Sequence, residues 1–255
     1  MRIDSTICRE NIALGIEVRD FIQNVPGAKE ESITDYLMWK WRALDSRFKF
    51  MRTIPFTRHQ EGTTTGADFE LELWLVGRTI GIPLLFQAKK FVPLFDAYVS
   101  KLNYPNNTQH QLQTLLSYAS ARQVGPFYAI YTTHVGTQLM CGAGQSQNTG
   151  IYMIDAFTAK RFADGQYGKR VSLDSILERS NPFHCMFCCP LRASNGYLGR
   201  YFNLDHRVVR ERIALPRYVE ALLSDGARAA DDGPTLDREL PSTRFIGVYD
   251  LADVD

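Results

Sequence analysis

The hydrophobic period of the chain changes from helical to alternating at about residue 48, and this change limits the folds that the chain can adopt. Before it, apolar residues recur at helical spacing: Ile33, Leu37, Trp41 and Leu44. After it, three segments alternate in hydrophobicity as strands do: 48–56, 67–75 and 83–91. A helical pattern over 106–122 and a strand-like segment over 125–133 follow. The order helix, three strands, helix, strand predicts a mixed α/β fold in which helices flank a small sheet.

Length and charge favour one folded domain with an acidic end. The chain has 255 residues, of which 45% are hydrophobic and 22% charged, as is usual for globular proteins. We expect a single domain over residues 1–225, with its core at about 28–135 and a helix over 6–23 before it. The net charge of +1 conceals an uneven distribution, because residues 224–255 contain eight acidic residues against three arginines. We therefore expect residues 226–255 to form an acidic, partly mobile tail.

The apolar runs and the cysteines bear on location. No apolar run approaches the roughly 20 residues that a membrane span needs, and the first residues lack the apolar block of a signal peptide, so we expect a cytoplasmic protein. The five cysteines are an odd number, and we expect them to be reduced. The segment 184–189 is either part of a zinc site or a buried strand. We favour the strand, because a zinc site needs four ligands and cysteine is among the most buried residue types.

Polar side chains fall on one face of two expected strands. Side chains two residues apart share a face of a strand, so Asp68, Glu70 and Glu72 lie together on the first strand. Gln87 and Lys89 lie together on the second. If the strands are neighbours with these faces together, the carboxylates, the amide oxygen and the ammonium group converge. Mg²⁺ prefers such oxygen ligands, and a nearby lysine stabilises charge that develops on a phosphodiester.

A second interpretation needs no site. The acids of 67–75 also suit the solvent face of a two-sided sheet, and Lys89 with Lys90 would then protect an edge strand. Gln109, Gln111 and Gln113 would be solvent-facing residues of the following helix. A basic and aromatic stretch precedes the strands: Lys40, Arg42, Arg47, Lys49, Arg52 and Arg58, with Trp39, Trp41, Phe48 and Phe50. It is either a surface that follows a phosphate backbone or a solvated face over core aromatics.

The letters "GAD" at 66–68 and "QAK" at 87–89, in this order of elements, resemble the PD-(D/E)xK superfamily of metal-dependent nucleases. Glutamine stands here where most members have an acid. The residues are also similar to a set of uncharacterised bacterial proteins assigned to that superfamily, and the similarity runs from about Glu30 to Tyr131. The resemblance implies a restriction-endonuclease-like α-β-β-β-α-β core that hydrolyses phosphodiester bonds.

The resemblance also implies roles for individual residues. Mg²⁺ or Mn²⁺ would be bound by Asp68, Gln87, Glu70 and Glu31. Lys89 would assist catalysis, and substrate would be contacted by Gln111, Lys90 and Arg58. The substrate would be DNA, in bacterial restriction or antiviral defence, and the protein would act as a homo-oligomer or with a partner of a defence system.

An alternative keeps the fold without the chemistry. Because Gln87 replaces an acid, the chain could instead be a catalytically inactive module that binds nucleic acid or a partner protein. A phosphoryl-transfer enzyme of the P-loop kind is not supported, since the sequence contains no GxxxxGK[ST] motif.

Overall fold

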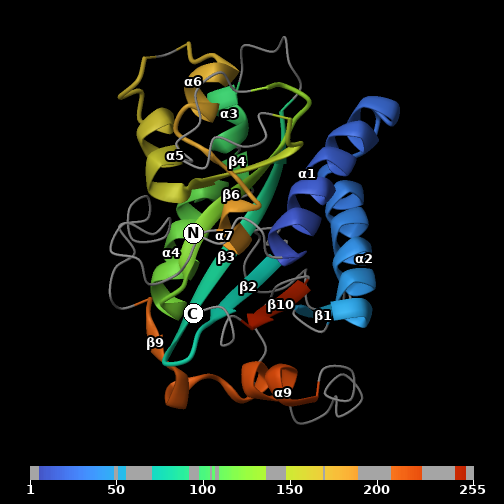
Figure 1. Ribbon diagram of the computed structural model, residues 1–255. Helices are drawn as coiled ribbons and strands as arrows, with labels where there is room; N and C mark the ends of the chain where they lie inside the picture. Colours follow the sequence, from blue (N-terminus) through green and yellow to red (C-terminus); the bar gives the residue numbers. More distant parts are fainter. Residues whose placement is uncertain are drawn as a thin grey trace.

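A computed structural model describes residues 6–48, 51–55, 71–91, 98–103, 105–106, 109–135, 148–168, 170–188, 208–225 and 245–250. It confirms the expected mixed α/β fold, with helices on both faces of one sheet (Figure 1). The expected succession is formed by α2 (Glu30–Phe48), β1 (Met51–Pro55), β2 (Leu71–Val76), β3 (Ile80–Lys90), α4 (Gln111–Arg122) and β6 (Gly125–Tyr131).

Further elements extend this core. They are α1 (Thr6–Asn24), α3 (Tyr98–Leu102), the short paired strands β4 (Pro105–Asn106) and β5 (Gln109–His110), β7 (Ile151–Asp155), α5 (Ala156–Ala163), α6 (Leu173–Leu177), β8 (Asn181–Pro182), α7 (Cys185–Cys188), β9 (Arg210–Glu211), the 3₁₀ turn η2 (Arg212–Ala214), α9 (Arg217–Asp225) and β10 (Phe245–Asp250). The large sheet has the order β1-β10-β2-β3-β6-β7-β8, and β9 pairs with the beginning of β3.

Strand β10 lies inside the sheet, which corrects one expectation. It pairs antiparallel with β1 and parallel with β2, and its residues are buried except for Asp250. Residues 245–250 are therefore not part of a mobile tail. Residues 226–244 and 251–255 lie outside the described residues. Acidic composition predicts a mobile tail, but the short run "FIGVY" favours a β-strand and its apolar residues need a buried position.

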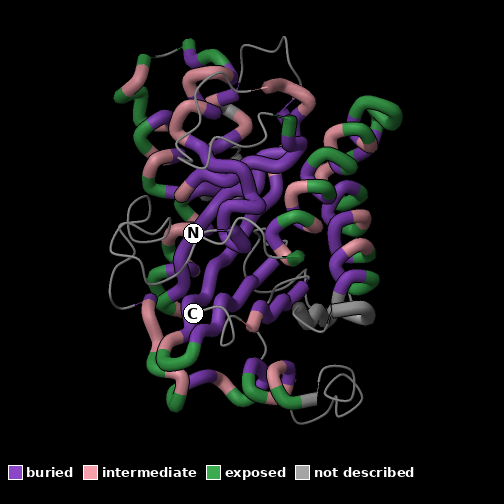
Figure 2. Tube along the Cα trace, in the orientation of Figure 1, coloured by how far each residue is buried: buried purple, intermediate pink, exposed green. Residues whose placement is uncertain are grey.

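The two faces of the sheet are covered by different helices. On β2, Leu71, Leu73 and Leu75 belong to a core cluster with α1 and α2. The side chains between them point to the other face of the sheet. There Leu85 of β3 packs with residues of α3 to α6, and Trp74 of β2 packs with residues of α9. Both sides of the sheet are thus buried (Figure 2). The alternation predicted for the two strands is confirmed over the residues described.

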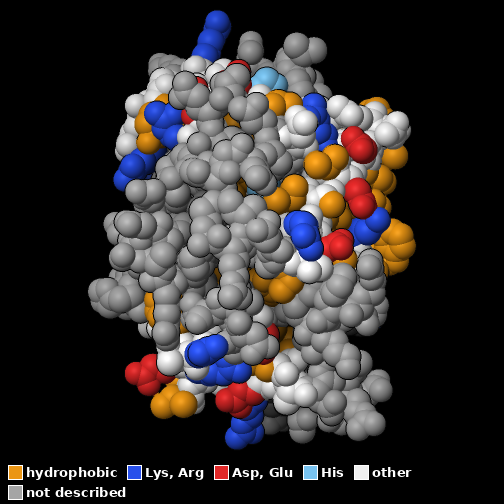
Figure 3. Space-filling model, in the orientation of Figure 1, with side chains coloured by type: hydrophobic (Ala, Val, Ile, Leu, Met, Phe, Trp, Pro, Cys, Tyr) orange, Lys and Arg blue, Asp and Glu red, His pale blue; other side chains and the backbone are white. Residues whose placement is uncertain are grey.

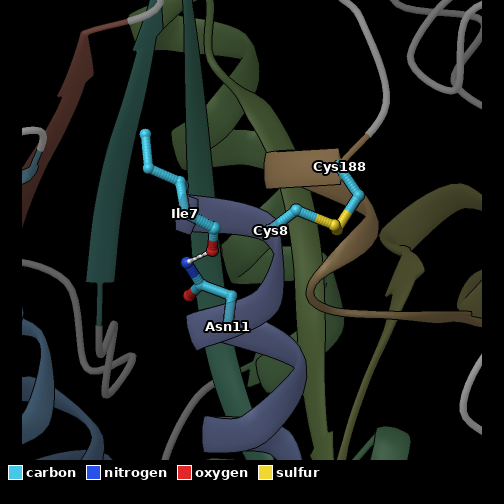
Figure 4. The surroundings of a disulfide bond; sticks show 4 residues. All are labelled: Ile7, Cys8, Asn11 and Cys188. Carbon is cyan, nitrogen blue, oxygen red and sulfur yellow. Dashed lines mark hydrogen bonds between the residues drawn. A yellow bond between two sulfur atoms is a disulfide. The ribbon is translucent and has the colours of Figure 1, made fainter. Parts of the chain in front are cut away.

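A disulfide joins the first helix to the segment that contains the cysteine cluster (Figure 4). Cys8 of α1 is bonded to Cys188 of α7, 180 residues later, with their Cα atoms 4.8 Å apart. The expectation that the cysteines are reduced is therefore wrong for this pair, while Cys185 is a buried thiol. Burial of the segment is confirmed, but residues 185–188 form a helical turn and not a strand. Cys141 and Cys189 lie outside the described residues.

Among the described residues, no helix combines the length and the apolar character needed to cross a membrane.

Candidate functional site

The second half of β3 carries a buried amide on the face covered by α4. The side chain of Gln87 is on the same face as Leu85, and the residue is 1% exposed. Both its Oε1 and its Nε2 are buried, and neither has a hydrogen-bond partner in the described part of the chain. Buried side-chain amides nearly always have partners, from protein, water or a bound ion. The partner of the Gln87 amide is therefore a ligand, a water molecule or a part of the chain outside the described residues.

Lys89 lies beside this amide, two residues further along the same face. Its Nζ donates to Oε1 of Gln111 at 2.5 Å. Gln111 is the first residue of α4 and is 8% exposed, so the expectation that it faces solvent is wrong. Gln113 is exposed, as expected. The contact fixes the lysine ammonium between the sheet and the start of α4.

An acid from α2 reaches the same end of β3. Oε1 of Glu30 accepts a hydrogen bond from the backbone N–H of Lys90 at 3.1 Å. The next backbone N–H, of Phe91, donates to the carbonyl oxygen of Tyr131 in β6. Successive N–H groups of a strand point to opposite sides, so the N–H of Lys90 and the Glu30 carboxylate lie on the β2 side of β3. Glu31, which the resemblance selected, is exposed. One residue along a helix turns a side chain by about 100°, so the two glutamates point in different directions.

Lys90 does not join this group. Its Nζ donates to the carbonyl oxygens of Pro26 at 2.5 Å and Ala28 at 2.8 Å, on the face covered by α1 and α2. This lysine fastens the turn between those helices to the end of β3. Contact of Lys90 with substrate stays a prediction.

The remaining expected ligands come before β2. Asp68, Glu70 and Arg58 lie outside the described residues. The antiparallel register places Leu71, at the beginning of β2, opposite Phe86, the neighbour of Gln87. Glu70 is the residue before Leu71, and three peptide units keep the Cα of Asp68 within about 11 Å of the Cα of Leu71. The two acids thus directly precede β2 in the sequence, and their convergence with Gln87 stays a prediction.

The comparison with known proteins was made on the whole chain. Residues 7–246 match a family described as "Family of unknown function (DUF6615)". The chain belongs to the DUF6615 family. No curated protein and no solved structure matches it. All the elements around Gln87 in this DUF6615 protein lie inside the matched range.

Glu72 has a different environment from the one expected. It is 0% exposed, and its Oε1 accepts hydrogen bonds from Nε1 of Trp74 and the hydroxyl of Tyr218, both at 2.7 Å. Burial raises the pKa of Glu72 above its usual value, although both donors and the charge of Arg122 act in the opposite direction. The solvent-face interpretation is thus wrong for Glu72. Its partner Tyr218 was not predicted, since nothing in the sequence links residues 146 positions apart.

The basic stretch before the strands is only partly described in the DUF6615 protein. Trp41 is fully buried and its Nε1 donates to Oδ1 of Asn11, so it belongs to the core. Nζ of Lys40 forms an ion pair with Glu17 at 2.5 Å. Arg42 is exposed, and the side chains of the other basic residues lie outside the described ones. The core interpretation is confirmed for Trp41, and a phosphate-binding surface stays a prediction.

No group of three or more His, Cys, Asp or Glu side chains within the described ranges could hold a metal ion. The described oxygen donors at this end of β3 are the amide of Gln87 and the carboxylate of Glu30, which come from different sides of the strand. Donors of this kind suit a hard cation when further carboxylates join them.

Proposed function

We propose that this DUF6615 protein is a metal-dependent nuclease that hydrolyses phosphodiester bonds of DNA, in bacterial restriction or defence. The observation that carries the proposal is the buried Gln87 amide without a hydrogen-bond partner among the described residues, beside the Lys89–Gln111 contact. Among the described residues nothing compensates the two buried polar atoms of Gln87, and an uncompensated buried polar atom costs about 1–3 kcal/mol.

The donors available at this end of β3 fit Mg²⁺ or Mn²⁺. Oε1 of Gln87, the carboxylate of Glu30 and the acids Asp68 and Glu70 would hold the ion, because hard cations bind oxygen ligands. When bound, such an ion supplies a Lewis acid and lowers the pKa of water. Glu30 takes the role that the resemblance gave to Glu31.

Lys89 supplies the positive charge of the proposed site. Gln111 accepts from its Nζ, which holds the ammonium group on the face that carries Gln87. A fixed ammonium stabilises negative charge that develops on the phosphate oxygens during hydrolysis. Gln111 is then a positioning residue, since it acts on the reaction through Lys89.

Cleavage assays with matched variants test the proposal. Supercoiled plasmid is incubated with Mg²⁺ or Mn²⁺ and wild-type protein, Lys89→Met, Asp68→Asn or the control Lys160→Ala. Among the described residues the side chain of Lys160 pairs only with Asp164, which caps the end of α5. We expect the first two variants to lose at least about 100-fold in rate, as removal of one electrostatic group at a reacting centre does. Cleavage that persists unchanged in both Lys89→Met and Asp68→Asn would falsify the assignment.

The alternative is a catalytically inactive module that binds nucleic acid or a partner. The amide at Gln87, where a charged ligand is usual, favours it. Calorimetry with Mn²⁺ separates the two functions. DNA binding by wild-type protein without Mn²⁺ binding or cleavage would establish the inactive module, whereas Mn²⁺ binding that Asp68→Asn abolishes supports the nuclease.

A further inference from the structure

A cavity of about 250 Å³ lies between the end of α4, strand β9 and helix α9. Its walls include Trp74 of β2, Pro83 of β3, Pro216 and Tyr218. Arg122 and Arg210 also line it. Pro83 and Lys89 are six residues apart on one strand, so the cavity is about 20 Å from the proposed nuclease site. It is therefore a separate place on the molecule.

The two arginines hold positive charge at this cavity. Nη1 of Arg210 donates to Oε1 of Gln123 at 2.7 Å, and its Nη2 donates to the carbonyl oxygen of Arg122 at 3.2 Å, so the guanidinium group of Arg210 is oriented by α4. Arg122 lies 5.8 Å from the ring centre of Tyr118. No carboxylate in the described part of the chain forms an ion pair with either arginine. The lower end of Figure 3 carries lysine or arginine side chains with aspartate or glutamate side chains beside them.

Arg122 and Arg210 line one cavity, and the charge of Arg122 also acts on the buried carboxyl group of Glu72 behind its wall. A bound anion would relieve the repulsion between the two guanidinium groups. Arginine presents several N–H donors in a fixed fork, which matches the oxygens of a carboxylate or a phosphate group. Arg122 and Arg210 are both partly exposed, so an anion can reach them from solvent. The charge at the cavity thus selects anionic ligands.

The aromatic wall of the cavity is fixed in place from behind. Trp74 and Tyr218 meet edge to face, with ring centres 6.3 Å apart. Both donate to the same oxygen of the fully buried Glu72. The other oxygen of that carboxyl group, Oε2, has no partner among the described residues. A rigid wall of two aromatic rings and two prolines suits a flat apolar group, because no side-chain freedom is lost when it binds.

We propose that this cavity binds a small organic anion, with its carboxylate or phosphate group on Arg122 and Arg210 and a flat apolar body against Trp74 and Tyr218. The proposal does not depend on nuclease activity, since it rests on other residues at the other end of β2 and β3.

Calorimetric titration with three probes tests it: inorganic phosphate, benzoate and adenosine monophosphate. We expect benzoate or adenosine monophosphate to bind saturably to the wild-type protein, and more tightly than inorganic phosphate. Benzoate and adenosine monophosphate distinguish a carboxylate from a phosphate source. Arg122→Gln and Arg210→Gln should each weaken binding about tenfold, because each removes charge-assisted hydrogen bonds. The matched control is Arg217→Gln, which changes charge on the exposed start of α9 outside the cavity lining.

The far-ultraviolet circular dichroism of each variant shows whether it is folded. Absence of saturable binding of any probe at about 10 mM to folded wild-type protein would overturn the proposal. Equal binding of inorganic phosphate and the organic probes would contradict the aromatic part of the site. Binding that both arginine variants retain at wild-type strength would contradict the assignment of the anion to these residues.

Discussion

The bond between Cys8 and Cys188 closes a loop of 180 residues, and its removal should destabilise the fold strongly. Closing a loop restricts the unfolded chain, and the restriction grows with the logarithm of loop length. For 180 residues the chain-entropy relation gives about 5 kcal/mol at 25 °C. With a urea dependence of about 3 kcal/mol per molar, Cys8→Ala should lower the midpoint of urea unfolding by about 1.5 to 2 M.

Urea unfolding with and without reductant measures this effect. Reductant should lower the midpoint of the wild-type protein towards that of Cys8→Ala and leave the variant unchanged. The control is Cys185→Ala, which removes a buried sulfur from α7, the helix that contains Cys188, but leaves the bond between Cys8 and Cys188. A wild-type midpoint that reductant does not move would refute the reasoning. So would a loss for Cys185→Ala as large as that for Cys8→Ala.

Two further predictions concern buried positions. Because burial raises the pKa of Glu72 above its ordinary value of 4.5, the protonated carboxyl group favours folding, and that contribution is lost as pH rises from 4.5 through the raised pKa. Glu72→Gln should therefore gain stability relative to wild type as pH rises above 4.5, seen as a change in the difference of urea midpoints; a difference independent of pH would contradict this. A Cβ on Gly150 would lie 2.4 Å from the backbone nitrogen of Arg19, so Gly150→Ala should cost about 2 kcal/mol or more in thermal unfolding experiments. A Cβ on Gly27 would have no atom within 4 Å, so Gly27→Ala should be nearly neutral. Equal losses of stability in Gly150→Ala and Gly27→Ala would show that the contact of Gly150 with α1 is not the cause.

Periodicity was sufficient to predict the core elements of this fold. The faces of β2 and β3 followed from alternation alone, because alternate side chains of each strand pack into different core clusters on the two sides of the sheet. The position of β10 was not predictable, since local pattern does not say which strands of a sheet become neighbours. The same reason explains the missed disulfide, whose cysteines are distant in sequence.

The candidate site was predicted in part. Gln87, Lys89 and Gln111 come together as the resemblance implied, because two of them share a strand face and the third begins the helix that covers it. The choice between Glu30 and Glu31 depends on the rotation of α2, which the sequence fixes only within a residue or two. The contacts of Lys90 with Pro26 and Ala28 were not predictable, because they depend on how the turn between α1 and α2 folds back.

The central position of β10 also has a consequence for the order of events during translation. The ribosome makes β1 and β2 early, yet the strand that separates them in the sheet begins only at residue 245. Until that strand emerges, both of its neighbours present unpaired backbone groups along one edge. Such edges are sites at which incomplete chains associate with each other. We therefore expect a ribosome that stalls before residue 245 to leave a product with two unpaired strand edges, which is prone to aggregate.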